Sequence, residues 1–136
     1  MSTRIIKINR GDSFEFTTEI PDKNDPTKNY MLSAENDDAF YFAICLPHQL
    51  FENAIILKGC TATSTDDITG EYDQNRETGK ITVKLTPAET MQLMPGIYYY
   101  TTKLYSGGTP GLVGSYCDAP TAVRTIIERT KFIVNE

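Results

Sequence analysis

The sequence predicts an all-β protein, an immunoglobulin-like antiparallel β-sandwich of about seven or eight strands with one short helical turn. Three observations lead to this fold class. Apolar and polar residues alternate in several segments with the period of a half-buried strand, turn-forming residues separate these segments, and only one segment carries helix-start signals. A chain of 136 residues also suits a single domain, residues 1–136.

Two strands are predicted near the start of the chain. The first is the short segment Arg4–Asn9, and the second is Phe14–Ile20, in which every other residue is suited to a core-facing side. The segment Pro21–Asn29 places proline, aspartate and asparagine at turn positions and is predicted to be a loop. Tyr30–Leu32 is short and apolar enough to add one brief strand.

The segment Ala39–Leu46 (AFYFAICL) is apolar on both of its alternating sets. A strand with only one face in the core would show polar residues on the other face, so we expect both faces to be covered. Either loops of the same chain or another molecule would provide the second cover. The next strand is predicted to begin at Ala54–Lys58.

The segment Gly79–Ser106 predicts a strand, one short helical turn and a second strand. Thr86 and Glu89 have the spacing of a capping box, and Pro87 occupies the first helical position, where the missing N–H costs nothing. We therefore assign structural roles to Thr86 and Glu89.

Gly96 and Tyr98 follow the helical turn at the start of a late strand. Sandwich folds often place a tyrosine corner there, in which the phenol bonds back to the preceding connection, and Gly96 is expected to need a conformation closed to β-branched residues. The last strand is predicted over Thr121–Val134. Ile126 and Ile127 put two large apolar residues on opposite sides of it, which predicts a bulge.

Arg10-Gly11-Asp12 spells a tripeptide known from cell adhesion, but here it lies between two predicted strands. Glycine supplies the positive φ that such a turn often needs, and an aspartate can cap nearby backbone N–H groups. We therefore interpret Gly11 and Asp12 as turn residues rather than as an adhesion motif.

Composition excludes several functional classes. The net charge of −5 is opposite to the basic footprint of a nucleic-acid-binding protein. The chain has no apolar run long enough to span a membrane and no signal-peptide segment, so we expect neither membrane insertion nor secretion. Three widely spaced cysteines, Cys45, Cys60 and Cys117, favour reduced thiols made in a cytosol over a disulfide framework.

No catalytic or cofactor-binding constellation is apparent in the sequence. His48 has no second histidine and no cysteine at ligand spacing, and no motif pairs it with a nucleophile. The acidic residues of the polar segment Thr61–Thr78 lack the order of a calcium loop, so solvated loop charge is preferred over Ca²⁺. No glycine-rich phosphate-binding motif occurs. We therefore predict no enzymatic activity, no cofactor and no metal.

Interface candidates are two tyrosines and two aspartates. Tyr41 and Tyr99 lie opposite the core-facing sets of their strands, and an outward tyrosine offers a large contact area with a polar tip. Ordinary half-exposed packing over neighbouring strands is an equal alternative, and stacking on a sugar is a third. Asp66 and Asp67 lie in the acidic loop, where they are either solvated or complementary to a neighbouring copy.

Two motifs carry a resemblance to a known family. They are I-x-R-G-D-S-F-x-F, from Ile8 to Phe16, and G-x-I-T-V-x-L-T-x-x-E-T-x-x-L-x-P-G-x-Y-Y-Y, from Gly79 to Tyr100. With the apolar middle strand and the terminal F-I-V at Phe132–Val134, the chain resembles the small immunoglobulin-like proteins of tailed bacteriophages. It is similar to the N-terminal domain of phage baseplate upper proteins over nearly its whole length.

The resemblance implies a non-enzymatic structural part of the virion, made in the cytoplasm of the bacterial host. Its site would be head decoration or a head fibre, the neck, or the tail and baseplate, and its partners would be other virion proteins and copies of itself. The segments Thr61–Thr78 and Gly107–Pro120 are longer than usual for the family, and no shaft domain follows Val134. An accessory or adaptor subunit is therefore expected. The alternative is a separate binding module for a host-surface glycan or protein.

Overall fold

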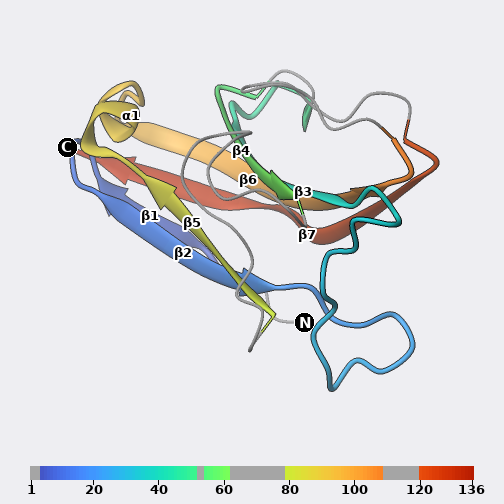
Figure 1. The fold of residues 1–136 in the computed structure, drawn as a ribbon. Helices are drawn as coiled ribbons and strands as arrows, with labels where there is room; N and C mark the ends of the chain where they lie inside the picture. Colours follow the sequence, from blue (N-terminus) through green and yellow to red (C-terminus); the bar gives the residue numbers. More distant parts are fainter. Residues whose placement is uncertain (1–3, 52–53, 62–78, 109–119) are drawn as a thin grey trace.

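The structure is a computed structural model that describes residues 4–51, 54–61, 79–108 and 120–136 (Figure 1). The described elements are β1 (Ile6–Asn9), β2 (Phe14–Glu19), β3 (Ala39–Cys45), β4 (Ile56–Thr61), β5 (Lys80–Leu85), α1 (Pro87–Met91), β6 (Gly96–Ser106) and β7 (Ala122–Asn135). Each predicted strand except Tyr30–Leu32 is present, with bounds that differ by a few residues. The helical turn lies where the capping-box spacing placed it.

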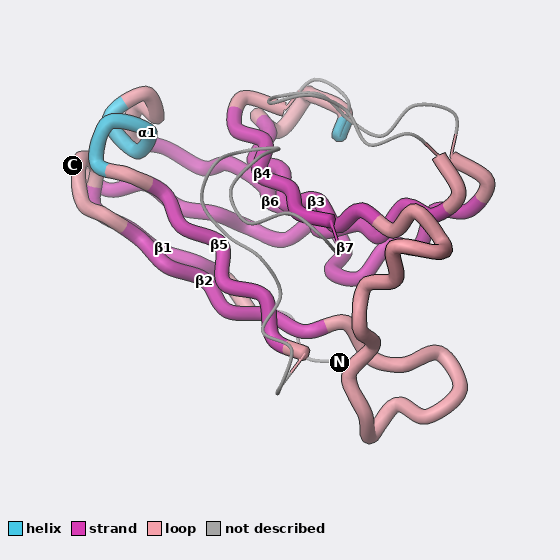
Figure 2. The backbone as a smooth tube through the Cα atoms, viewed as in Figure 1, coloured by secondary structure: helices cyan, strands magenta, loops and turns pink. Residues whose placement is uncertain are grey.

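The strands of the described residues form two layers (Figures 1 and 2). One sheet has the order β1-β7-β6-β3-β4, and the other consists of β2 and β5. Figure 2 shows α1 at the end of the sandwich where the C-terminus lies. The prediction of an all-β sandwich is therefore confirmed.

One strand pairing differs from the antiparallel prediction. β1 pairs with β7 in parallel, with Ile6 opposite Phe132 and Asn9 opposite Asn135, whereas the other four pairings among the described strands are antiparallel. The reason is that the chain changes sheets between β1 and β2. The two strands therefore form no hairpin, and β1 extends the five-stranded sheet beside a strand that runs in its own direction.

The core between the sheets is built from aromatic rings contributed by both layers. The ring of Phe16 on β2 lies 5.8 Å from that of Phe42 and 5.6 Å from that of Tyr100, and Tyr100 continues to Phe132 at 6.4 Å. These separations fall in the range of favourable aromatic contacts. All four residues are buried, so the alternating residues of β2 face the core as predicted.

Strand β3 is covered on both faces, as its double apolar pattern predicted. All seven of its residues are buried. Phe40, Phe42 and Ile44 belong to the main core, whereas Ala39 and Tyr41 lie in a second cluster on the outer face of the sheet. The sequence left open whether residues of the same chain or another molecule would cover this outer face. Residues of the same chain cover it around Tyr41.

The predicted bulge in the last strand is present. The register between β6 and β7 shifts around Thr102, which lies opposite Ile127. Ile126 and Ile127 are both buried although they are neighbours in sequence. The Thr102 hydroxyl accepts a hydrogen bond from the Ile127 N–H at 3.0 Å, which satisfies a buried donor at the irregularity.

The connection between β2 and β3 contains a loop at Pro21–Asn29, as predicted. The brief strand expected at Tyr30–Leu32 is wrong, because the chain makes only an isolated bridge between Pro21 and Asn29 and then turns. The Tyr30 N–H donates to the Ile20 carbonyl at 2.7 Å, and this bond ends the pairing.

Candidate interaction surfaces

The Arg10-Gly11-Asp12 turn docks on α1, far away in sequence. Gly11 has a φ of 89°, which confirms its predicted role, and its N–H donates to the Thr90 hydroxyl at 3.1 Å. Thr90 in turn donates to the Asp12 carbonyl at 2.9 Å, so Asp12 takes part through its backbone. The Arg10 guanidinium donates to the Met91 carbonyl at 2.8 and 3.2 Å. The tripeptide is thus bound within the fold as a turn.

The capping box of α1 is complete. The Glu89 N–H donates to the Thr86 hydroxyl at 3.2 Å, and the Thr86 N–H donates to the Glu89 carboxylate at 2.9 Å. Both residues have the structural roles predicted from their spacing.

The Glu89 carboxylate also forms an ion pair that the sequence did not predict. Its second oxygen lies 2.8 Å from the Lys58 ammonium of β4, whose side chain is only 4% exposed. Burial raises the pKa of Glu89, but hydrogen bonds from Lys58 and from the Thr86 N–H outweigh it. The pKa of Glu89 is therefore lowered. The pair ties the edge of the five-stranded sheet to the helix that follows β5.

The tyrosine corner is present at the start of β6. The Tyr98 hydroxyl donates to the Met94 carbonyl at 2.8 Å, back into the connection after α1, and Tyr98 is buried. Gly96 has a φ of 155°, and no heavy atom lies within 4 Å of the position that its Cβ would take. Glycine is therefore favoured at position 96 by the backbone conformation, and not because a larger side chain would clash with a neighbour.

The position of Tyr41 contradicts the prediction that it is an interface residue. We expected an outward interface tyrosine, but its side chain is fully buried under Phe51, Leu57 and Tyr105. The connection between β3 and β4 folds back over this part of the outer face, which the alternation of β3 alone did not reveal. The Tyr41 ring also lies against Gly59, where a Cβ would come within 2.7 Å of it.

Tyr99 is half-buried on the outer face of the five-stranded sheet, and one face of its ring is occupied. The Arg129 guanidinium carbon lies 4.6 Å from the ring centroid. Arg129 also donates to the carbonyls of Gln49, at 3.1 Å, and Leu46, at 3.0 Å, so it holds the β3–β4 connection on this face. Through its contact with Arg129, Tyr99 therefore helps to hold the β3–β4 connection in place.

Asp38 is a buried carboxylate that joins the connection before β3 to the end of β6, which is distant in sequence. It accepts hydrogen bonds from the Tyr30 hydroxyl, from the Ser33 N–H at 2.8 Å and from the Ser106 hydroxyl at 2.6 Å. Burial, and then the hydrogen bond to Asp38, raise the pKa of Tyr30. Asp38 therefore has a structural role, because its carboxylate oxygens accept hydrogen bonds from three groups that the fold holds in place.

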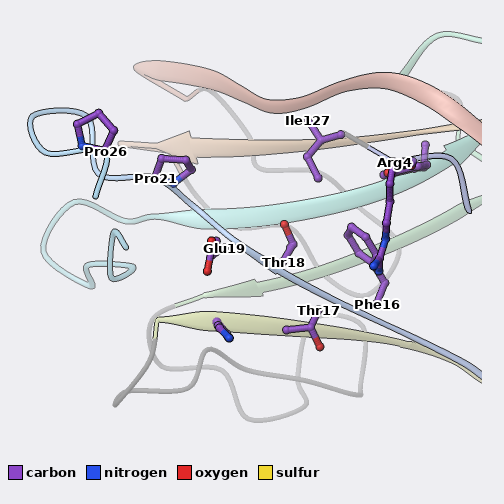
Figure 3. Close-up of a pocket in the computed structure, with 10 residues that line it drawn as sticks. Arg4, Phe16, Thr17, Thr18, Glu19, Pro21, Pro26 and Ile127 are labelled. Carbon is purple, nitrogen blue, oxygen red and sulfur yellow. Dashed lines mark hydrogen bonds between the residues drawn. The ribbon is translucent and has the colours of Figure 1, made fainter. Parts of the chain in front are cut away.

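A half-open hollow of about 540 Å³ lies between the two sheets beside the end of β2 (Figure 3). Arg4 stacks over Phe16 at 5.0 Å, and the Tyr100 hydroxyl donates to the Arg4 carbonyl at 2.5 Å. Burial raises the pKa of Tyr100. Glu19 on the wall accepts from the Asn29 amide at 3.2 Å. These polar groups are engaged with one another and shape the surface of the hollow.

Three large apolar side chains are exposed at the α1 end of the sandwich. Met91 is 50% exposed, Met94 63% and Ile97 49%, and they fall within one short stretch of the chain. The backbone carbonyl of Met91 accepts a hydrogen bond from Arg10, and that of Met94 accepts one from Tyr98. A fixed backbone therefore presents this apolar group, which we call the end surface.

The remaining sequence-based sites are partly outside the described residues. Asp66 and Asp67 lie there, as does Cys117, while Cys45 and Cys60 are buried thiols. In the part of the chain that the structure describes, no group of three or more His, Cys, Asp and Glu residues is placed to hold a metal ion. Across the same residues, no helix has the length and apolar character needed to cross a membrane.

Comparison of the chain with models of known protein families finds no match, and comparison with curated proteins finds none either.

Proposed function

We propose that this protein is a non-enzymatic structural subunit of a tailed-bacteriophage particle, an accessory or adaptor part that works through protein–protein contacts. It is made in the bacterial host cytoplasm and acts in the virion. Support for the phage setting comes from the two motifs that span Ile8–Phe16 and Gly79–Tyr100. Support for a structural role comes from what their residues do inside the fold.

The motif residues are engaged in bonds that fasten one end of the sandwich. Arg10 and Gly11 bind α1, and Tyr98 binds the connection after α1. Thr86 and Glu89 close the cap of the same helix. These side chains are occupied in holding backbone in place, which favours a rigid building block over a site that must bind and release a substrate.

The single observation that carries the contact role is the end surface of Met91, Met94 and Ile97. Exposed apolar side chains that gather within a few residues of the chain favour a protein–protein contact. Methionine suits such a surface because its unbranched, polarisable side chain adapts to a partner. The fixed backbone beneath lowers the ordering cost of association.

The proposal is tested on phage particles purified from a lysate of the bacterial host that makes the protein. Mass spectrometry of the intact particles should find the chain, and labelling should locate it at the head, neck or tail. Particles without the chain, with all of it in the soluble fraction, would overturn the proposal.

A matched pair of variants tests the end surface itself. Met94→Glu and Ile97→Glu together should reduce recovery of the chain on particles while leaving its melting temperature close to wild type. Leu50→Glu is the control, because Leu50 is 66% exposed but lies on the β3–β4 connection. Equal recovery of both variants would exclude the end surface as the contact.

The positions of Tyr41 and Tyr99 argue against the alternative of a glycan-binding module, in which a tyrosine ring would stack on a sugar. Tyr41 is fully buried and offers no face to a sugar, and one face of Tyr99 is covered by Arg129. A glycan array probed with the purified protein would test this alternative directly, and we expect no binding.

A further inference from the structure

The outer face of the five-stranded sheet has an accessible region where β1, β7 and β6 lie side by side (Figure 1). The strand register places Lys7 of β1, Ile133 of β7 and Ile97 of β6 in one row across the three strands. Lys131 and Tyr99 form the next row. The alternation of buried and accessible positions along each strand turns these five side chains outward. We call Lys7, Lys131, Ile133 and Ile97 the basic face.

The two ammonium groups of the basic face are not neutralised by the fold. Lys7 and Lys131 are exposed, and neither forms an ion pair with a residue that the structure describes. Two other cations of the same sheet are engaged: Lys103 lies 4.5 Å from the centroid of the Phe51 ring, and Arg129 bonds the β3–β4 connection. The basic face therefore carries local positive charge on a chain whose net charge is −5.

Acidic residues are absent from the two rows themselves. β1 and β6 contain no aspartate or glutamate. On β7 the acidic residue is Glu128, which precedes Arg129, and Glu136 follows the end of the strand. The residues opposite the two lysines in the register are Ile133 and Tyr99, which carry no charge at neutral pH.

The basic face continues into the end surface. Ile97 belongs to both, and it is 49% exposed. Met94 lies two residues before β6, and its side chain is also exposed. The result is an apolar area with two lysines along one side of it. Apolar groups at the centre and charged groups at the rim are the usual composition of a protein–protein contact.

We infer that the basic face and the end surface together bind a different protein of the particle, whose contact surface is apolar at its centre and carries carboxylates at its rim. Apolar groups of the partner would cover Ile97 and Ile133, and its Asp or Glu side chains would face Lys7 and Lys131. Opposite charges at the rim steer the encounter and fix the orientation of the partners. This inference rests on the proposed function and names the chemistry of the neighbouring subunit.

Charge argues against two other occupants. A symmetric contact between two copies would bring the same face of both together, so the lysines of one copy would meet those of the other. Like charges placed together across an interface are costly. An anionic membrane would attract the lysines, but the net charge of −5 opposes the approach of the whole chain to an anionic surface.

Carbodiimide cross-linking tests the contact directly, because it joins an amine to a carboxylate that lies against it without adding a spacer. On intact particles it should link Lys7 or Lys131 to an Asp or Glu residue of another particle protein. Mass spectrometry of the digested product identifies both linked residues. Lys23 and Lys84 are exposed lysines away from the basic face, and they should give no comparable yield.

A double variant tests the contribution of the two charges. Lys7→Gln with Lys131→Gln should reduce retention on particles at low salt by about 2- to 30-fold, the combined effect of two exposed charge pairs. Its retention should also depend less on salt than that of wild type, because salt screens exposed pairs. Lys23→Gln with Lys84→Gln makes the same change of net charge elsewhere and should be retained like wild type. Both double variants should melt close to the wild-type temperature.

Three results would overturn the inference. The first is cross-links from Lys7 and Lys131 that lead only to other copies of this chain, or none at all. The second is a Lys7→Gln, Lys131→Gln protein that is retained like the control at every salt concentration. The third is binding of the purified chain to phosphatidylglycerol vesicles that this variant loses, which would assign the face to a membrane.

Failure of the inference is distinguishable from failure of the proposed function. If the chain is on particles but the cross-links and the double variant give the negative results, the proposed function survives without this contact. If the chain is absent from particles, the proposed function fails, and so does the assignment of the partner to the particle. Cross-linking in the host cells that make the chain then shows whether Lys7 and Lys131 contact the carboxylates of another protein at all.

Discussion

The ammonium of Lys58 lies 2.8 Å from the carboxylate of Glu89, and this pair joins β4, the last of the described strands in the order of its sheet, to the helix that follows β5. Lys58 occupies a core-facing position beside Ile56 and Cys60, where a charge without a partner is costly. Glu89 supplies the partner and simultaneously caps α1. One carboxylate therefore fastens both the helix and the sheet edge.

Glu89→Gln should lower the free energy of unfolding by about 1.5–3 kcal/mol, the range for a hydrogen bond to a charged group. A glutamine can still complete the capping box with Thr86, so the change isolates the loss of charge opposite Lys58. Urea denaturation gives the measurement. Thr86→Ala serves as the comparison, since it removes a cap contact and leaves the ion pair in place. A Glu89→Gln protein as stable as wild type would show that the pair contributes nothing.

The stability of the fold should fall in acid partly because of Glu89. Its pKa is lowered in the folded state, so between the folded and unfolded values the unfolded chain binds more protons and stability rises with pH. The contribution is complete above about pH 4.5, the ordinary glutamate value, and is lost as pH falls through the lowered folded value. Melting curves from pH 6 downward, on wild type and Glu89→Gln, should converge at low pH as this difference disappears. Parallel curves would contradict the assignment.

Tyr98→Phe should destabilise the protein by about 1–3 kcal/mol, because the Met94 carbonyl loses its donor and Tyr98 is buried. Tyr99→Phe is the matched control, in which the same hydroxyl is removed from the half-buried outer face. We expect its melting temperature to stay within the error of wild type. The corner assignment would have to be dropped if both variants melted together.

Gly96→Val should be more damaging than its open surroundings suggest. No atom lies within 4 Å of the missing Cβ, so any loss reflects the φ of 155°, which L side chains rarely adopt. Thermal unfolding of Gly96→Ala and Gly96→Val would show the loss in both, larger for valine because of its β-branch. If alanine is tolerated without loss, the position does not require glycine.

Gly59→Ala should cost about 1–3 kcal/mol, the range for overpacking, because the new Cβ would come within 2.7 Å of the Tyr41 ring and 3.1 Å of the Phe40 carbonyl. Combining it with Tyr41→Leu should recover part of the loss, since the smaller side chain removes the closer clash. A double-mutant cycle measures this coupling. Additive losses would place the strain at the Phe40 carbonyl instead.

The fold was predictable where the relevant information is local. The period-two alternation of β2 and β5, the capping box at Thr86 and Glu89, and the paired isoleucines of β7 each depend on a few neighbouring residues, and all are found as expected. The positive φ of Gly11 was predictable for the same reason, since glycine is favoured where a turn needs it.

Features that depend on tertiary placement were not predictable. Tyr41 was expected outside, because its strand pattern does not reveal that the connection around Phe51 folds over it. The parallel β1–β7 pair requires knowledge of which sheet the chain enters after Gly11. A buried ion pair at Lys58 could have been suspected, because Lys58 is a single charge among the core-facing residues of an apolar strand. Its partner could not have been identified, because Glu89 is distant in sequence.

The parallel pairing of β1 with β7 has a mechanical consequence. Because both strands run in the same direction, the end of the chain before Ile6 and the end after Asn135 leave this strand pair on opposite sides. A force that pulls the two ends apart would act along the strands and load the hydrogen bonds between them together, in shear. Such a force would therefore meet resistance from the whole ladder at once, whereas a hairpin would open bond by bond.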